Sequence, residues 1–308
     1  MTRVPHTLSK SGVTEKNLLS LPWQDYELLD SGDTMKLERF GSVIVARPET
    51  QALWAKRRPE LWQNTHALFS FSTTKGSWEV RSPLPEPWII SFADASARLK
   101  LTPFKHTGIF PEQAPNWAWV RERTHALEPK SGGASDTEKP HVLHLFGYTG
   151  MMSVVVAKAG ARVTHVDSSK QSVEWARENA RLSNLPETAI RFLTEDALAF
   201  SKREARRGTR YNGIILDPPA FGRGAKGEVW RIEKDLPALL ASLRTLLSDA
   251  PGSFFLLSGY AAGYAPHSFA QAVESAFEGV SVEAGELQIQ ESSGERVVPA
   301  GISVRFTR

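Results

Sequence analysis

The chain has 308 residues, of which 41% are hydrophobic and 23% are charged, and it carries a formal net charge of +3. This length accommodates two domains with one large buried core, and the composition is ordinary for a soluble globular protein. The chain contains no cysteine, which excludes disulfides, thiolate metal sites, iron–sulfur clusters and thiol nucleophiles. Its polar start and the lack of 18 consecutive apolar residues indicate neither a signal peptide nor a membrane span, so we expect a cytoplasmic protein with no membrane partner. The mildly basic balance is compatible with a nucleic acid partner.

Short β-segments with many aromatic residues characterise residues 22–127, which follow an N-terminal tail of residues 1–21. A hairpin is predicted from residues 26–30 and 35–40, followed by strands at residues 42–48, 78–80 and 88–92. Seven of the nine tryptophans lie in this region: Trp23, Trp54, Trp62, Trp78, Trp88, Trp117 and Trp119. Such tryptophans usually fill a small core, and the alternative is a surface on which nucleic acid bases stack. We expect this β-rich region to be an accessory unit that binds substrate.

A polar stretch rich in Gly and Ser at residues 128–140 indicates a linker, after which strands and helices alternate. Strands are predicted at residues 141–146, 162–167, 189–193, 211–216 and 252–258, and helices at residues 151–159, 170–182, 230–247 and 266–277. This alternation is typical of βαβ crossovers and a parallel sheet. Two final strands, at residues 282–290 and 301–307, are separated by a short loop without a helical pattern and should pair antiparallel. Residues 141–308 are therefore predicted to form an α/β domain.

The ends of the first three strands carry residues suited to a nucleoside. Gly147 and Gly150 lie in the first strand-to-helix turn, where glycine lets the backbone approach a ligand. Asp167 ends the second strand, where a carboxylate can accept both ribose hydroxyls, and Asp196 follows the third strand, placed for the amine of an adenine. A dinucleotide would need G-x-G-x-x-G, whereas this shorter G-x-x-G turn contains Tyr148. S-adenosylmethionine, a nucleoside without a phosphate, fits better.

The fourth strand ends in Leu-Asp-Pro-Pro-Ala-Phe at residues 216–221. Proline cannot donate a ladder hydrogen bond, so Pro218 and Pro219 stop the strand and stiffen its end. Asp217 and two peptide carbonyls are then held at the carboxyl end of a strand, where open α/β sheets bind ligands. Phe221 supplies a flat surface nearby, and this combination suits a planar nitrogenous group such as a nucleobase. The alternative is a proline-stiffened turn without a chemical role.

Three of these segments, residues 141–167, 194–198 and 216–221, together resemble class I S-adenosylmethionine-dependent methyltransferases. More narrowly, they resemble the bacterial group of large-subunit rRNA methyltransferases that carry F-S-Y-T-G and D-P-P-x-F motifs. Residues 105–113 are similar to the K-T-G-x-F-x-D-Q motif of that group, with His106 in place of the lysine and Glu112 in place of the aspartate. The resemblance implies a Rossmann-like seven-stranded sheet with an antiparallel C-terminal strand pair, plus a smaller N-terminal β-rich domain.

The residues and the resemblance together assign roles to individual side chains. The expected cofactor-binding residues are Phe146, Gly147, Tyr148, Thr149, Gly150, Asp167, Ser168, Asp196, Ala197 and Asp217. The expected catalytic corner comprises Asp217, Pro218, Pro219 and Phe221, and the expected substrate-binding residues are Phe221, Arg223 and Lys226. Tyr260 and His106 are candidates for the rim of the pocket, with a structural role as the alternative. No metal is implied.

We expect methyl transfer from S-adenosylmethionine to a base nitrogen of RNA, with rRNA as the substrate, by direct displacement. Members of the group that make 5-methylcytosine use a cysteine that adds to the base, and serine is a far weaker nucleophile, so covalent chemistry is rejected for this cysteine-free chain. Two alternatives stay open: methylation of a protein amide or a small molecule, and an RNA-binding protein that has lost catalysis. The presence of Asp167, Asp196 and Asp217 argues against lost catalysis. The oligomeric state is not predicted.

Overall fold

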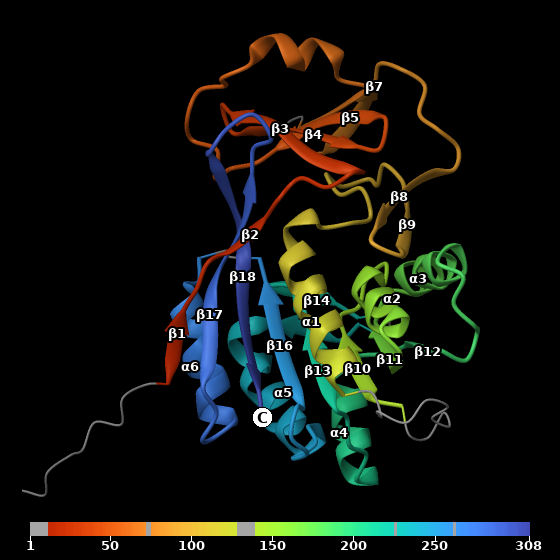
Figure 1. The fold of residues 1–308 in the computed structure, drawn as a ribbon, viewed down its shortest axis with the longest axis vertical. Helices are drawn as coiled ribbons and strands as arrows, with labels where there is room; N and C mark the ends of the chain where they lie inside the picture. The colour runs from red at the N-terminus through yellow and green to blue at the C-terminus, as the bar shows by residue number, and fades with distance from the viewer. Residues whose placement is uncertain (1–11, 72–74, 128–138, 225–226, 261–262) are drawn as a thin grey trace, which may run out of the picture.

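The computed structural model describes residues 12–71, 75–127, 139–224, 227–260 and 263–308, so most of the predicted linker lies outside the described residues (Figure 1). The strands are β1 (Val13–Glu15), β2 (Leu18–Ser20), β3 (Tyr26–Gly32), β4 (Met35–Phe40), β5 (Val43–Pro48), β6 (Ala67–Phe71), β7 (Gly76–Val80), β8 (Trp88–Phe92), β9 (Ala95–Leu99), β10 (His141–Leu145), β11 (Arg162–Asp167), β12 (Ile190–Thr194), β13 (Gly213–Leu216), β14 (Phe221–Arg223), β15 (Val229–Arg231), β16 (Phe254–Gly259), β17 (Val282–Gln290) and β18 (Val297–Thr307). The α-helices are α1 (Ala114–Ala126), α2 (Met151–Lys158), α3 (Lys170–Leu182), α4 (Ala197–Arg207), α5 (Ile232–Leu246) and α6 (Pro266–Ala276), and the short 3-10 helices are η1 (Pro59–Asn64) and η2 (Pro111–Gln113). None of the helices in these ranges has the length and apolar character needed to cross a bilayer.

A nine-stranded sheet organises the larger half of the molecule. Its order is β1-β17-β18-β16-β13-β10-β11-β12, and β2 also pairs with β17. Strands β12, β11, β10, β13 and β16 pair parallel in that order, whereas β18 pairs antiparallel with both β16 and β17. The predicted α/β architecture with an antiparallel C-terminal strand pair is therefore confirmed, and β1 and β2 add to its seven strands.

Strand β13, Gly213–Leu216, is apolar and buried along its whole length. Ile215 packs into the core that includes Val154 of α2, on one face of the sheet. Ile214 and Leu216 point the other way, into the core that includes Leu239 of α5. Because successive side chains of a strand alternate between faces and both faces are covered, apolar residues are favoured at every position of β13.

The order of the strands reverses at β10, which lies between β11 and β13. The chain leaves β10 through α2 to reach β11 on one side, and later returns to β13 on the other side. Loops that follow neighbouring strands diverge at such a point and leave a crevice at the carboxyl ends of the strands. This crevice positions the site described below.

A five-stranded sheet, β3-β4-β5-β6-β7, and the hairpin β8-β9 form the β-rich N-terminal region (Figure 1). Figure 1 shows the long strands β17 and β18 reaching from the central sheet to this region. At their tip, Ser31 donates a hydrogen bond to Glu291 across 2.5 Å, and Leu28 forms a parallel bridge with Glu291. The two halves of the molecule are thus joined by hydrogen bonds as well as by the chain.

Tryptophans of the N-terminal region bind the backbone through their indole N–H groups. Trp88, which is 4% exposed, donates to the carbonyl oxygen of Phe40, and Trp78 donates to that of Thr102. A buried indole needs such an acceptor, because its N–H loses water on burial. These contacts are those of tryptophans that fill a core.

Several features of the first 127 residues were not predicted, among them strands β6 and β9. Strands β1 and β2 lie within the segment expected to be an N-terminal tail, and both pair parallel with β17. Helix α1 lies in a region where only β-segments were expected. It buries the polar side chains of Asn116 and Thr124 together with Trp117 and Val120. A helix that buries polar residues lacks the apolar periodicity by which helices are predicted.

Candidate active site

The turn between β10 and α2 has an unusual backbone. Phe146, Tyr148 and Gly150 have φ angles of 54°, 49° and 80°, in the left-handed region that favours glycine. For Phe146 and Tyr148 this conformation costs on the order of 1–3 kcal/mol each, and such strain persists where surrounding contacts impose it. The Tyr148 N–H donates to Asp167 across 2.8 Å, and the Thr149 hydroxyl donates to the carbonyl oxygen of Gly108 across 2.5 Å. These contacts hold the turn against β11 and the segment before η2.

The two glycines of this turn are required by the protein's own packing. A Cβ on Gly147 would lie 2.3 Å from the ring of His165, and a Cβ on Gly150 would lie 2.7 Å from the Cβ of Ala176. His165 cannot swing away easily, because Ser153 bridges it to His144 with hydrogen bonds of 2.9 and 2.7 Å. These glycines were predicted to let the backbone approach a ligand, and in the structure they also leave room for His165 of β11 and Ala176 of α3.

Asp167 lies at the end of β11, as predicted, and lines the crevice. Its carboxylate accepts the backbone N–H groups of Tyr148 and Ser169, each across 2.8 Å. Burial raises the pKa of Asp167, and these two hydrogen bonds oppose the rise. A carboxylate has about four acceptor positions, so about two are left for hydroxyl groups of a ligand.

Asp196 caps helix α4, with one carboxylate oxygen accepting the backbone N–H of Ala199 across 2.8 Å. It lines a cavity of about 70 Å³ together with Asp167, Ser168, Ala197 and other residues. Arg223 lines this same cavity, at the Asp196 end of the crevice. The three strand ends that the sequence singled out therefore meet in one place.

The Asp-Pro-Pro corner follows β13 and is held in place by hydrogen bonds from β15 and from the first residue of α5. Trp230 donates its indole N–H to the carbonyl oxygen of Pro219 across 2.7 Å, so this carbonyl is already engaged. The ring of Trp230 lies 4.9 Å from that of Phe146, which connects the corner to the β10–α2 turn. Pro218 and Pro219 both line the same cavity as Asp217.

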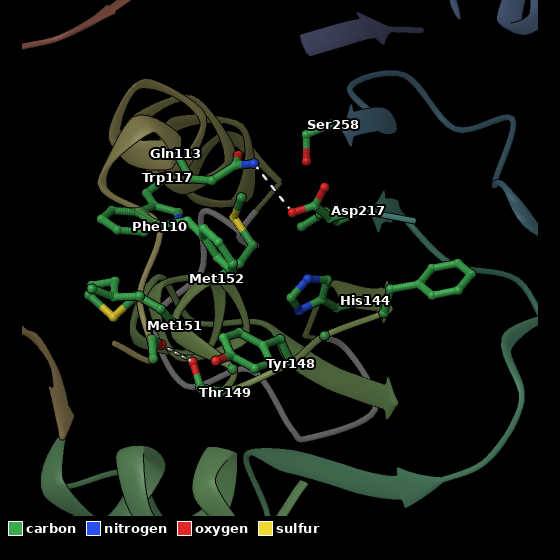
Figure 2. A pocket seen from close by; sticks show the side chains of 16 residues that line it. Phe110, Gln113, Trp117, His144, Tyr148, Thr149, Met151, Met152, Asp217 and Ser258 are labelled. Atoms are coloured by element: carbon green, nitrogen blue, oxygen red, sulfur yellow. Dashed lines mark hydrogen bonds between the residues drawn. The ribbon is translucent and has the colours of Figure 1, made fainter. Parts of the chain in front are cut away.

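Asp217 faces a chain of oriented side chains (Figure 2). Gln113 donates to Asp217 across 3.4 Å and accepts from Asn116 across 2.8 Å, and Asn116 accepts from the hydroxyl of Ser303 across 2.9 Å. Because the amide oxygens of Asn116 and Gln113 are both engaged as acceptors, their N–H₂ groups must act as donors. The N–H₂ of Asn116 donates to Gln113, and the N–H₂ of Gln113 donates to Asp217. Ser258 lies beside Asp217 in Figure 2.

The environment of Asp217 changes its acidity. Burial, together with the nearby charge of Glu112, raises its pKa from 3.8 to about 6, while the hydroxyl of Ser258 acts in the opposite direction. A carboxylate with this pKa is ionised at neutral pH and can still take up a proton easily. This behaviour suits a group that orients a donor N–H and then accepts its proton.

Three adjoining cavities form one groove along the crevice. A cavity of about 60 Å³ lies at the β10–α2 turn, and one of about 490 Å³ extends from Asp167 past Asp217 to Tyr260. Phe146 lines both of these cavities and the one at Asp196. The cavity of about 490 Å³ is also lined by Lys105 and His106, which come from the segment resembling K-T-G-x-F-x-D-Q. That segment lies outside the α/β domain in sequence and yet supplies a wall of the groove.

The remaining predicted residues lie elsewhere. Phe221 begins β14, is 54% exposed and lines none of these three cavities. Lys226 lies outside the described residues. Within the described ranges, no three His, Asp or Glu side chains converge in a way that could hold a metal ion. Sequence reasoning missed Gln113, Ser258 and Trp230, although the motif that ends in Gln113 was a signal for the first.

Comparison with known proteins shows the family to which the chain belongs. Residues 50–285 match the family described as S-adenosylmethionine-dependent methyltransferase. The chain belongs to this family. A solved structure of the S-adenosylmethionine-dependent methyltransferase from Agrobacterium tumefaciens is 36% identical, with a TM-score of 0.87, over 97% of this chain and 96% of that one. The structure of SMU.776 complexed with SAH has a TM-score of 0.67 at 20% identity, over 92% of this chain and 75% of that one, and shows the shared fold.

Among curated proteins, the methyltransferase is similar to part of much longer chains. It is 33% identical to ribosomal RNA large subunit methyltransferase K/L of Shewanella frigidimarina over 156 residues, which is 50% of this chain and 20% of that protein. The protein of the same name from Shewanella amazonensis is 33% identical over 165 residues, 53% of this chain and 21% of that protein. The match thus covers only about a fifth of these relatives.

The groove of the methyltransferase fits its cofactor, S-adenosylmethionine. Asp167 has unused acceptor positions that ribose hydroxyls could fill, and Asp196 and Ala197 line the neighbouring cavity, which would hold the adenine. The β10–α2 turn lines the opposite end, which would hold the amino acid part. Asp217 lines both the turn cavity and the large cavity, so it lies where the cofactor and an acceptor would meet.

Proposed function

We propose that this methyltransferase methylates a base nitrogen of RNA, with ribosomal RNA as its substrate, by direct displacement. The observation that supports this most strongly is Asp217, a carboxylate held by Gln113 at the junction of the turn cavity and the large cavity. The names of the rRNA methyltransferase relatives support the choice of substrate class. Since the chain has no cysteine, a covalent thiol adduct with the base is excluded.

The chain's own residues would act mainly by positioning. When bound, S-adenosylmethionine supplies a methyl group already activated on a sulfonium, so little acid–base help is needed. Asp217 would accept an N–H of the base and direct the nitrogen lone pair toward the methyl group. The attacking nitrogen becomes more acidic as it gains the methyl group, and Asp217, with a pKa of about 6, can accept the proton it releases.

We also propose that the β-rich region of residues 22–127 contributes to substrate binding. Its strand β5 is joined to the groove: Arg47 donates to the carbonyl oxygen of Lys105 across 3.1 Å, and Lys105 donates to that of Pro48 across 3.2 Å. Lys105 lines the large cavity, where its ammonium lies 5.8 Å from the ring centroid of Tyr260. A cation beside an exposed aromatic ring suits a nucleotide, whose base stacks and whose phosphate is anionic.

The test is methyl transfer from tritiated S-adenosylmethionine to total rRNA, total tRNA and total protein from a strain that lacks the enzyme. We expect label in rRNA, and mass spectrometry of its nucleosides should place the methyl group on nitrogen. Label in protein alone, or a methyl group on carbon 5 of a pyrimidine, would overturn the proposal.

A further inference from the structure

Glu112 is a buried carboxyl group that the reaction described above does not use. It lies in the 3-10 helix η2, is 8% exposed and lines the large cavity together with Asp217. Its own backbone N–H contacts the carboxylate, and the oxygen Oε2 has no hydrogen-bond partner among the described residues. Burying a carboxylate without full hydrogen bonding lowers the stability of the fold, so a functional role for Glu112 is worth testing.

The burial of Glu112 is not explained by an ion pair, because the nearby cations are paired with other carboxylates. Arg47 is bound to Glu38 through two hydrogen bonds of 2.5 and 3.0 Å. Lys36 lies 3.3 Å from Glu49 and 3.7 Å from Glu38. In the part of the chain that the structure describes, no Lys or Arg lies within ion-pair distance of Glu112. Burial therefore raises the pKa of Glu112, although the charges of Lys36 and Arg47 act in the opposite direction.

The partner that Glu112 lacks can come from the cavity. The cavity of about 490 Å³ has Glu112 and Asp217 among its lining residues, and their charges interact. Nδ1 of His106, another lining residue, also has no partner among the described residues. The repulsion between two carboxylates is relieved when donors bind between or beside them. A ligand with several N–H groups supplies such donors.

We propose that Glu112 is a specificity-determining residue, whose carboxylate accepts one N–H of the methyl acceptor while Asp217 accepts another. This inference rests on the proposed function, and it adds that the site selects a planar group with at least two N–H donors. An acceptor presenting a lone pair to either carboxylate would be repelled, which gives discrimination as well as affinity.

The experiment compares Glu112→Gln and Glu112→Asp with the unaltered full chain. Methyl-transfer kinetics, binding of S-adenosylmethionine by calorimetry and thermal unfolding are measured for each. We expect Glu112→Gln to raise the KM for the acceptor roughly 10-fold or more, the scale of one hydrogen bond to a charged group, with cofactor affinity unchanged. Glu112→Asp keeps the carboxylate and should recover most of that loss. Because Glu112→Gln removes an unpaired buried charge without changing volume, its Tm should be equal to or above that of the unaltered chain.

Glu49→Gln is the matched control. Glu49 is also buried, but it is paired with Lys36 and does not line the cavity. It should show the opposite pattern, a lower Tm with an unchanged KM, because it leaves Lys36 with a weakened partner. An unchanged KM in Glu112→Gln would overturn the inference, as would a lower Tm accompanied by weaker cofactor binding, which indicates a structural role.

The outcome also separates this inference from the proposed function. If the unaltered chain labels rRNA and Glu112→Gln has a normal KM, the role of Glu112 is wrong and the proposed function stands. If the unaltered chain labels a protein or a small molecule instead, the proposed function fails. The same kinetic comparison with that acceptor then tests Glu112, and a raised KM still supports it.

Discussion

Trp230 donates its indole N–H to the carbonyl oxygen of Pro219 across 2.7 Å. This bond joins strand β15, which contains Trp230, to the corner that follows β13. It keeps the chain after Asp217 from moving as a free loop. The corner is therefore rigid for two reasons: the prolines restrict φ, and Trp230 restricts the position of the peptide group.

We expect Trp230→Phe to separate these two contributions. The ring still packs near Phe146 but the donor is lost, which should lower the free energy of unfolding by about 1 kcal/mol. Turnover should fall roughly 10-fold, because small displacements of positioning groups have large effects on rate. Urea unfolding and steady-state kinetics measure both. Trp62→Phe is the control, since Trp62 donates to Asp30, lines none of the three cavities and should affect stability but not turnover.

Asp167→Ala should weaken binding of S-adenosylmethionine by about 2–3 kcal/mol, the scale for hydrogen bonds to a charged acceptor. The change also removes the acceptor that holds Tyr148 in its left-handed conformation, so the turn should relax. Isothermal titration calorimetry checks the affinity. Unchanged affinity, or binding of NAD in its place, would contradict the assignment of this site.

Asp217→Asn preserves the shape of the side chain while removing its charge. Binding of S-adenosylmethionine should stay close to that of the unaltered chain, whereas turnover should fall about 10²-fold if one preorganised contact is worth about 3 kcal/mol. Single-turnover measurements of methyl transfer with saturating cofactor test this directly. A variant with normal turnover would show that Asp217 does not orient the acceptor.

The pH dependence follows from the same residue. Because the pKa of Asp217 is about 6, it loses its charge as pH falls through this value, so kcat/KM should fall below about pH 6. The groups that face it are Glu112, Gln113 and Ser258, with Lys105 and His106 in the same cavity. His106 has a pKa lowered to about 4 by burial and nearby cations, so it stays neutral across this range. The inflection should disappear in Asp217→Asn, and its persistence there would assign it to another group.

The raised pKa of Asp217 also makes the stability of the fold depend on pH, and stability changes with pH in the opposite direction to activity. The folded chain holds a proton on Asp217 up to about pH 6, whereas the ordinary value is 3.8. Between these values the native state binds more protons than the unfolded state, so the contribution of Asp217 to stability falls as pH rises. Denaturant unfolding across this window, compared with Asp217→Asn, measures the difference.

Gly147→Ala should destabilise the fold by about 1–3 kcal/mol, because its Cβ would overlap a buried ring that Ser153 holds in place. Gly12→Ala is the control, since the nearest atom to its Cβ lies 3.5 Å away, an ordinary contact. Denaturant titration of both variants gives the comparison. Equal stability of the two would mean that His165 can move.

The sequence by itself determined the α/β domain and the strand ends that line its groove. Strands and helices alternate, and the carboxyl ends of parallel strands meet at one edge, so residues that follow strands, such as Asp167, Asp196 and Asp217, must come together whatever the details of packing. The same local logic predicted the hairpin of β3 and β4. The sequence alone also excludes thiol chemistry, because it contains no cysteine.

Only the tertiary structure decided which side chains surround Asp217. Gln113 is 104 positions away in the chain and reaches Asp217 because α1 packs beside β18, where Ser303 orients Asn116. No local pattern encodes that approach, since it depends on the fit of two distant surfaces. The same limit applies to Phe221: its position after the prolines suggested a stacking surface, but its place at the start of β14 depends on pairing with β15, which turns the ring away from the cavities and into solvent. Sequence periodicity specifies which residues are buried within each element, whereas the contacts between elements follow from packing, which is a property of the whole chain.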